Sequence, residues 1–141
     1  MTSRPDLLDL ELPAAAEALT SMRRSLRSWL RGLGLDEETV AELALVCTEV
    51  CTNAIEHGYA EVGGSGPIHM TGTAVDGVLR LEVRDHGHWR EGDPSPGRGN
   101  GLRVVRALMD HVTIRRGDDG TDVVMYRWLE NAMRLASGAH S

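Results

Sequence analysis

The sequence predicts an α+β fold, a two-layer α/β sandwich in which one mixed or antiparallel sheet carries helices on a single face. Alternating apolar segments occur in adjacent pairs joined by short glycine turns, at residues 68–85 and 111–129, which indicates β-hairpins. Apolar residues three and four apart, at residues 14–33 and 40–59, indicate amphipathic helices. Strands that are grouped in hairpins, with helices in separate segments, favour this architecture.

Length and composition limit the classes of function. The 141 residues are 41% apolar and 26% charged, so we expect a single domain over residues 1–141, with residues 1–8 and 131–141 flexible. Aromatic residues are sparse at 4%, which argues against a surface that stacks nucleic-acid bases. The net charge of -6 disfavours nucleic-acid and anionic-membrane partners. No leader and no membrane-spanning apolar run are recognised, so we expect a cytoplasmic protein.

The first elements are a short strand and a helix. Residues 8–12 alternate leucine with acidic residues, as in a half-buried strand, and Pro13 ends it. The helix at residues 14–33 carries four arginines on its polar side: Arg23, Arg24, Arg27 and Arg31. These arginines favour a solvated surface, with an acidic partner protein as the alternative.

The helix predicted at residues 40–59 is the centre of the pattern, because two of its sides are apolar. One apolar stripe faces the sheet: Val40, Leu43, Ala44, Cys47, Cys51, Ala54 and Ile55. On the other side Glu49 and Asn53, four residues apart, are flanked by Leu45, Val46 and Val50. Such a pair is typical of a solvated helix face, but within a partly apolar crevice it suggests a site.

Local signals define the ends of this helix and the nature of its thiols. Asp36 is predicted to cap the helix, with Leu35 and Val40 as a hydrophobic staple. Gly58 ends it. Cys47 and Cys51 are predicted to be buried small hydrophobes rather than a disulfide.

The second half of the chain alternates strands with glycine-rich loops. We expect a turn at residues 61–67, strands at 68–75 and 78–85, a loop or lid at 86–98, a helix at 102–109, and strands at 111–116 and 121–129. Gly99, Asn100 and Gly101 open that helix, and glycine amides at a helix N-terminus can bind a phosphate.

The order of these motifs resembles the ATP site of the gyrase/histidine-kinase/MutL superfamily. The motifs are Glu49-x-x-x-Asn53 with His57, Asp85-His86-Gly87, Gly97-Arg98-Gly99-Asn100-Gly101-Leu102, and Gly120-Thr121. Within the superfamily, the short chain and the segment CTNAIEHGY resemble the anti-sigma-factor serine/threonine kinases. The resemblance extends over residues 10–129.

The resemblance implies roles for individual residues. It implies that Glu49 is the catalytic base and that Asn53 is the ligand of Mg²⁺, a hard cation that prefers oxygen donors. Asp85 would bind the adenine amino group, supported by Thr121 through a second hydrogen bond. The remaining nucleotide-binding positions that it implies are His57, Gly87, Gly97, Gly99, Gly101 and Leu102.

The expected activity is transfer of a phosphoryl group from ATP to a serine or threonine of a small anti-sigma-factor antagonist. The resemblance also implies a sigma factor as a second partner and a possible homodimer. One alternative is a non-catalytic, nucleotide-gated binding module, and another is an ATPase fragment of a larger enzyme. The chain departs from the family pattern at His88, where a glycine is frequent, and this departure bears on lid flexibility and ATP affinity.

Overall fold

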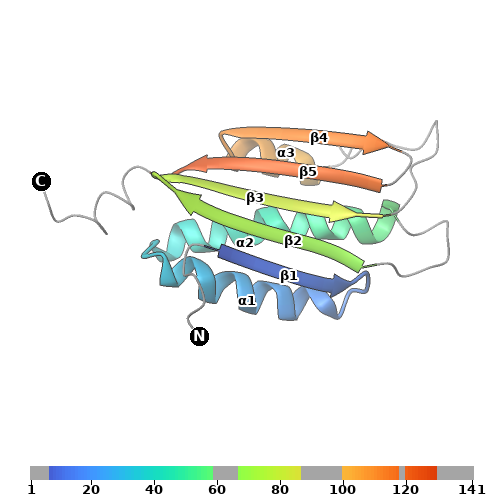
Figure 1. Cartoon of the computed structure of the whole chain (residues 1–141), viewed down its shortest axis with the longest axis horizontal. Helices are drawn as coiled ribbons and strands as arrows, with labels where there is room; N and C mark the ends of the chain where they lie inside the picture. The colour runs from blue at the N-terminus through green and yellow to red at the C-terminus, as the bar shows by residue number, and fades with distance from the viewer. Residues whose placement is uncertain (1–6, 59–66, 87–99, 118–119, 130–141) are drawn as a thin grey trace, which may run out of the picture.

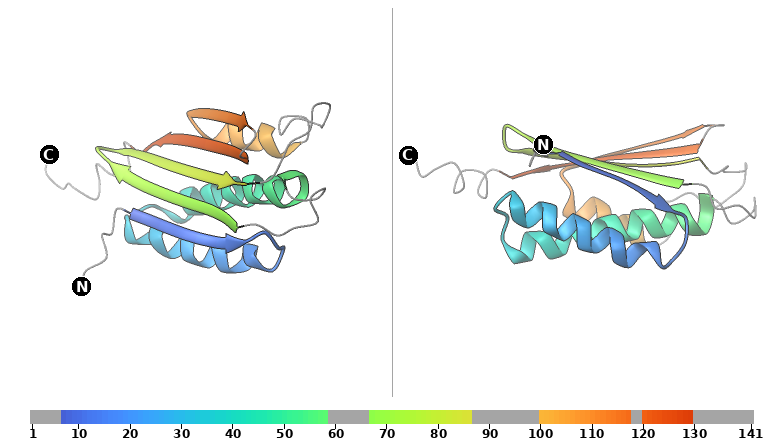
Figure 2. Two further views of the ribbon diagram at one scale, coloured as in Figure 1. Left: turned by 45° about the vertical axis from the view of Figure 1, so that its right-hand side comes forward. Right: turned by 60° about the horizontal axis from the view of Figure 1, so that its bottom comes forward.

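The computed structural model describes residues 7–58, 67–86, 100–117 and 120–129, and at positions 57, 58, 100 and 101 only the backbone. The elements in chain order are β1 (Leu7–Pro13), α1 (Ala18–Gly32), α2 (Glu37–Asn53), the π-helical turn η1 (Ala54–Gly58), β2 (Pro67–Val75), β3 (Val78–Asp85), α3 (Asn100–Leu108), β4 (His111–Gly117) and β5 (Gly120–Trp128). They form one sheet with helices on one face, which confirms the predicted α+β sandwich (Figures 1 and 2). The predicted lid lies outside the described residues except for His86.

The sheet has the strand order β1-β2-β3-β5-β4, and every neighbouring pair is antiparallel. The sheet is therefore antiparallel rather than mixed. Strand β5 lies between β3 and β4, so that Thr121 at the start of β5 pairs with Asp85 at the end of β3. Two residues that are far apart in the sequence thus meet at one end of the sheet.

The central position of α2 explains why this helix is apolar on two sides. It lies between α1 and α3 beneath the sheet (Figure 1), and it packs against both of them. Six residues of the predicted stripe are buried, Val40, Leu43, Ala44, Cys47, Cys51 and Ala54, and so are Val46 and Val50 on the flank. Ile55 is only partly buried, and Leu45 is exposed.

Several element boundaries differ from the prediction, and those of α1, α2 and β1 show the causes most clearly. Helix α1 begins at Ala18, four residues after the predicted start, because Pro13 and Ala15 accept turn hydrogen bonds from the amides of Ala15 and Ala18. Helix α2 ends at Asn53 and continues as the wider turn η1, a geometry that side-chain periodicity does not reveal. Strand β1 begins at Leu7, inside the stretch that we expected to be flexible, because Leu7 pairs with Thr73 of β2.

The local predictions around α2 are confirmed. The amide of Thr39 donates a 2.8 Å hydrogen bond to Asp36 Oδ1, so Asp36 is the N-cap, and Leu35 and Val40 are both buried. Cys47 and Cys51 are free, buried thiols. Within the described residues, no helix combines the length and the apolar character that a membrane crossing requires.

Candidate functional site

A cavity lies at one end of the sandwich, between helices α2 and α3 on one side and strands β3 and β5 on the other. Its volume is about 330 Å³, including space that is open to solvent. The lining residues are Val50, Asn53, Ala54, Val83, Asp85, Leu102, Thr121 and Val123. Five of these are apolar and three are polar, a composition typical of sites for small organic ligands.

Asp85 is the most deeply buried charged residue of this cavity, with only 4% of its surface exposed. The backbone amide of Thr121 donates a 3.3 Å hydrogen bond to Asp85 Oδ1. A buried carboxylate requires hydrogen-bond donors, and this amide is one of them. Asp85 is therefore held by the pairing of β3 with β5, and it presents an acceptor to the cavity.

Gly120 allows this close approach of the two strands. Its φ is +133°, a conformation that residues with side chains rarely adopt. A Cβ atom built on Gly120 would lie 1.9 Å from the carbonyl oxygen of Asp85 and 2.8 Å from the Cα of His86. Only glycine fits here without displacing the end of β3.

The buried hydroxyl of Thr121 is a second polar group that indicates a ligand site. Thr121 is buried, and its Oγ1 has no hydrogen-bond partner among the residues that the structure describes. An orphaned hydroxyl in a cavity is costly unless a ligand or water satisfies it. Asp85 and Thr121 together offer an acceptor and a group that both donates and accepts, which fits the amino edge of adenine.

Asn53 is the last residue of α2 and lines the same cavity. Its carboxamide oxygen is the kind of donor that Mg²⁺ prefers, and a single protein ligand is sufficient where phosphates and water complete the shell. No cluster of three or more His, Cys, Asp or Glu side chains suited to a metal occurs among the described residues. The donor set therefore fits a metal bound together with a nucleotide rather than a metal held by protein side chains alone.

Four of the residues singled out in the sequence meet at this cavity: Asn53, Asp85, Leu102 and Thr121. Glu49 lies one turn before Asn53 on α2 and is partly exposed, but it is not among the lining residues. Gly101 belongs to the first turn of α3, next to Leu102.

The other predicted positions are His57, whose backbone belongs to η1 and whose side chain lies outside the described part of the chain, and Gly87, Gly97 and Gly99, which lie outside it entirely.

The apolar lining is only partly evident from the sequence. The pattern places Val50 beside the crevice around Glu49 and Asn53, and the family resemblance implies Leu102 as a nucleotide-binding residue. The contributions of Val83 and Val123 from the sheet are not predicted, and Ala54 is predicted to face the sheet rather than a site. Gly120 precedes Thr121 in one of the predicted motifs, and an isolated glycine at the first position of a strand is a usable signal of close backbone approach.

Comparison with known proteins identifies the fold and the family. A sequence profile of the histidine kinase-like ATPase domain matches residues 12–127. The serine-protein kinase RsbW of two Staphylococcus aureus strains is 21% identical over 146 residues, which cover 92% of this chain and 91% of the relative.

Solved structures agree with this result. The crystal structure of the RsbU and RsbW domains of Rv1364c from Mycobacterium tuberculosis aligns with a TM-score of 0.72 and 31% identity over 87% of this chain. The chain spans only 32% of that larger protein. The histidine kinase domain of the blue-light-activated kinase EL346 from Erythrobacter litoralis aligns with a TM-score of 0.62 and 26% identity, over 87% of this chain and 64% of that one. With the profile covering most of the chain, this protein belongs to the histidine kinase-like ATPase domain family.

Proposed function

We propose that this protein is an ATP-dependent serine/threonine protein kinase that acts as an anti-sigma factor. It would phosphorylate an anti-sigma-factor antagonist and bind a sigma factor, exchanging one partner for the other. The observation that carries the proposal is the cavity that joins Asn53, Asp85 and Thr121 in a chain of this ATPase family. The relatives named serine-protein kinase RsbW support the choice of a protein substrate.

The proposed roles follow from the chemistry of the side chains. Asp85 accepts a hydrogen bond from the adenine amino group, and the Thr121 hydroxyl binds the same edge of the base. Asn53 would contribute an oxygen ligand to Mg²⁺, and the bound metal would supply charge stabilisation for the transferring phosphoryl group. The amides of Gly99, Gly101 and Leu102 bind the phosphates, and Gly87 allows the backbone to approach the base closely. His57 and Gly97 are the remaining proposed nucleotide-binding positions.

Glu49 is the proposed base. It accepts the proton of the substrate hydroxyl while the hydroxyl oxygen bonds to the terminal phosphorus and the bond from phosphorus to the ADP oxygen breaks. Glu49 lies one helical turn from Asn53, and its partial exposure leaves it accessible to a protein substrate. The alternative is a nucleotide-gated binding module without catalysis, which needs Asn53 and Asp85 but no base, so the presence of Glu49 favours the enzyme.

Nucleotide binding is tested by calorimetry with ATP in Mg²⁺ and in EDTA. We expect Asn53→Ala to remove the advantage of Mg²⁺, because the metal loses its protein ligand. The matched control is Thr52→Ala, the neighbouring residue on α2, which does not line the cavity. Equal ATP affinity in Mg²⁺ and EDTA for the wild-type chain would contradict the metal assignment.

Base recognition is tested by competition with GTP. The carbonyl of guanine would face the Asp85 carboxylate, so two acceptors would oppose each other, and GTP should bind about 10- to 100-fold more weakly than ATP. Equally effective competition by the two nucleotides would remove Asp85 from the base site.

Catalysis is separated from binding by Glu49→Gln, with Glu38→Gln at the exposed start of α2 as the control. The substrate is the antagonist protein recovered by ATP-dependent pull-down from the source cell, and transfer is followed with radiolabelled ATP. We expect Glu49→Gln to keep its ATP affinity while transfer falls by about 10²- to 10⁴-fold, the usual cost of a lost general base. Normal transfer by Glu49→Gln would show that Glu49 is not the base. No transfer by the wild-type chain would favour the binding module.

A further inference from the structure

Arg127 occupies an unexpected position for a cation. On β5, the residues Thr121, Val123 and Met125 alternate toward the helices and are buried. Arg127 continues this inward-facing series, and its side chain is only 20% exposed. A cation in such surroundings requires specific partners to offset its loss of hydration.

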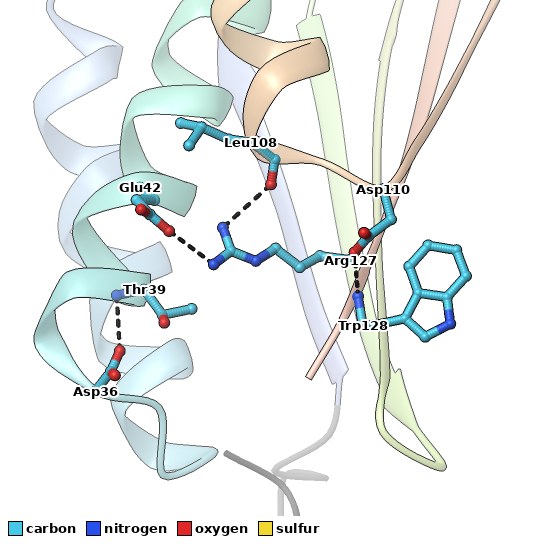
Figure 3. A network of polar contacts seen from close by, with 7 residues as sticks. All are labelled: Asp36, Thr39, Glu42, Leu108, Asp110, Arg127 and Trp128. Atoms are coloured by element: carbon cyan, nitrogen blue, oxygen red, sulfur yellow. Dashed lines mark hydrogen bonds and ion pairs between the residues drawn. The ribbon is translucent and has the colours of Figure 1, made fainter. Parts of the chain in front are cut away.

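The guanidinium group of Arg127 joins three elements (Figure 3). Its Nη2 donates a 2.7 Å hydrogen bond to Oε1 of Glu42 on α2, and its Nη1 donates a 3.2 Å hydrogen bond to the carbonyl of Leu108. Leu108 is the last residue of α3, so no amide of the helix donates a hydrogen bond to its carbonyl. A cation at this end also interacts favourably with the helix dipole.

A second set of contacts holds the same end of α3. The amide of Asp110 donates a 2.8 Å hydrogen bond to the carbonyl of Tyr126. The Asp110 carboxylate accepts a 2.8 Å hydrogen bond from the amide of Trp128, which Figure 3 shows. These two contacts bind the turn after α3 to β5 on either side of Arg127. Arg127 alone of these residues extends the connection to α2.

The cavity lies at the opposite end of the same helix pair. Leu102, in the first turn of α3, and Asn53, in the last turn of α2, both line it. Helix α3 packs chiefly against α2, so the distance across the cavity depends on the angle between the two helices. Leu102 lies six positions before Leu108, about 9 Å along the helix axis, so a tilt of about 10° at Leu108 would move Leu102 by about 1.5 Å. A misplacement of about 1 Å in groups that align reactants can reduce a reaction rate about 100-fold, and contacts that bind a ligand depend on the same spacing.

We propose that Arg127 is a positioning residue for the nucleotide site. By joining Glu42 of α2 to the C-terminal end of α3, it sets the angle between the helices and hence the spacing between Asn53 and Leu102. It does so from the end of the helix pair remote from the cavity, without touching the nucleotide. This inference rests on the proposed function, because it assumes that the cavity binds ATP.

The test compares Arg127→Gln with wild type by calorimetry with Mg²⁺ and ATP, and by urea denaturation of the same samples. The matched control is Arg80→Gln, which removes a partly buried arginine of β3 whose partners among the described residues, Glu82 at 3.0 Å and the Tyr126 hydroxyl at 3.4 Å, both belong to the sheet. We expect Arg127→Gln to weaken ATP binding about tenfold after correction for the folded fraction, and Arg80→Gln to leave it unchanged. A purely stabilising role would lower the urea midpoint and leave the corrected affinity of Arg127→Gln at the wild-type value, which would overturn the proposal.

Two further variants keep the test decisive. Arg127→Lys retains the positive charge but loses the guanidinium group, whose two terminal nitrogens contact two partners. We expect an intermediate loss of ATP affinity, about threefold. If Arg127→Gln does not fold, an unchanged affinity in Arg127→Lys overturns the proposal. Glu42→Gln should also weaken binding, because it loosens the α2 side of the same contact. Failure of the wild-type chain to bind ATP would refute the proposed function itself, whereas ATP binding that is indifferent to Arg127 would refute only this inference.

Discussion

Substitution of Gly120 by alanine is the most direct test of how the site is built. Two costs are expected. The first is conformational, because φ is +133° at this position, and a side chain in such a region costs about 1–3 kcal/mol. The second is steric, because the new Cβ would lie 1.9 Å from the Asp85 carbonyl oxygen. Relief requires the end of β3 to move, and such overpacking typically costs about 1–3 kcal/mol.

The matched control is Gly77→Ala in the turn between β2 and β3. Gly77 also has a positive φ, +78°, but a Cβ there would have no neighbour within 4 Å. This variant therefore incurs the conformational cost alone, about 1–2 kcal/mol. The difference between the two variants isolates the contact with Asp85.

The assay is urea denaturation of both variants, analysed as a two-state transition, followed by ATP titration of the folded proteins. We expect Gly120→Ala to lose at least about 1 kcal/mol more unfolding free energy than Gly77→Ala. Only Gly120→Ala should lose ATP affinity, because only this substitution displaces Asp85. Equal destabilisation with equal ATP affinity would refute the argument that Gly120 positions Asp85.

Three other predictions concern single groups. Thr121→Val removes a hydroxyl that has no partner among the described residues, so the unfolding free energy of the free protein should change by no more than about 1 kcal/mol. Calorimetry should show a roughly tenfold loss of ATP affinity. A loss of stability without a loss of affinity would contradict this prediction. Burial raises the pKa of Cys51 to about 12 and that of Cys47 well above its usual range. Ellman's reagent at pH 8 should therefore label both thiols only after the protein is unfolded in urea. Rapid labelling of the folded chain would contradict the burial of these two side chains. Hydrogen bonds from the side chain and backbone of Thr39 lower the pKa of Asp36, so the stability it contributes is complete above its ordinary pKa and is lost as the pH falls through the lowered value. The unfolding free energy, measured at a series of acidic pH values, should therefore fall less steeply with decreasing pH in Asp36→Asn than in the wild type. Identical pH dependence of the two proteins would exclude this contribution.

Several features of the molecule are determined locally, and these the sequence predicts well. The buried stripe of α2 follows from a spacing of three and four residues, and the Asp36 cap follows from one side chain and the amide three residues later. The hairpin of β2 and β3 follows from alternation around Asp76-Gly77. In each case the interacting groups are close in the sequence, so the pattern contains the whole interaction. The roles of Glu49 and Asn53 in phosphoryl transfer stay predictions.

The tertiary structure decides the features that join distant segments. Insertion of β5 between β3 and β4 brings Thr121 to Asp85, and an inward-facing arginine at position 127 meets Glu42, 85 residues away. The periodicity of a segment records which of its own faces is buried, but it does not record which element covers that face. The widened turn after Asn53 and the close approach at Gly120 likewise depend on the packing of neighbours. Sequence therefore specified the elements and most of the polar side chains of the site, whereas the shape of the cavity arose from contacts that only the folded chain makes.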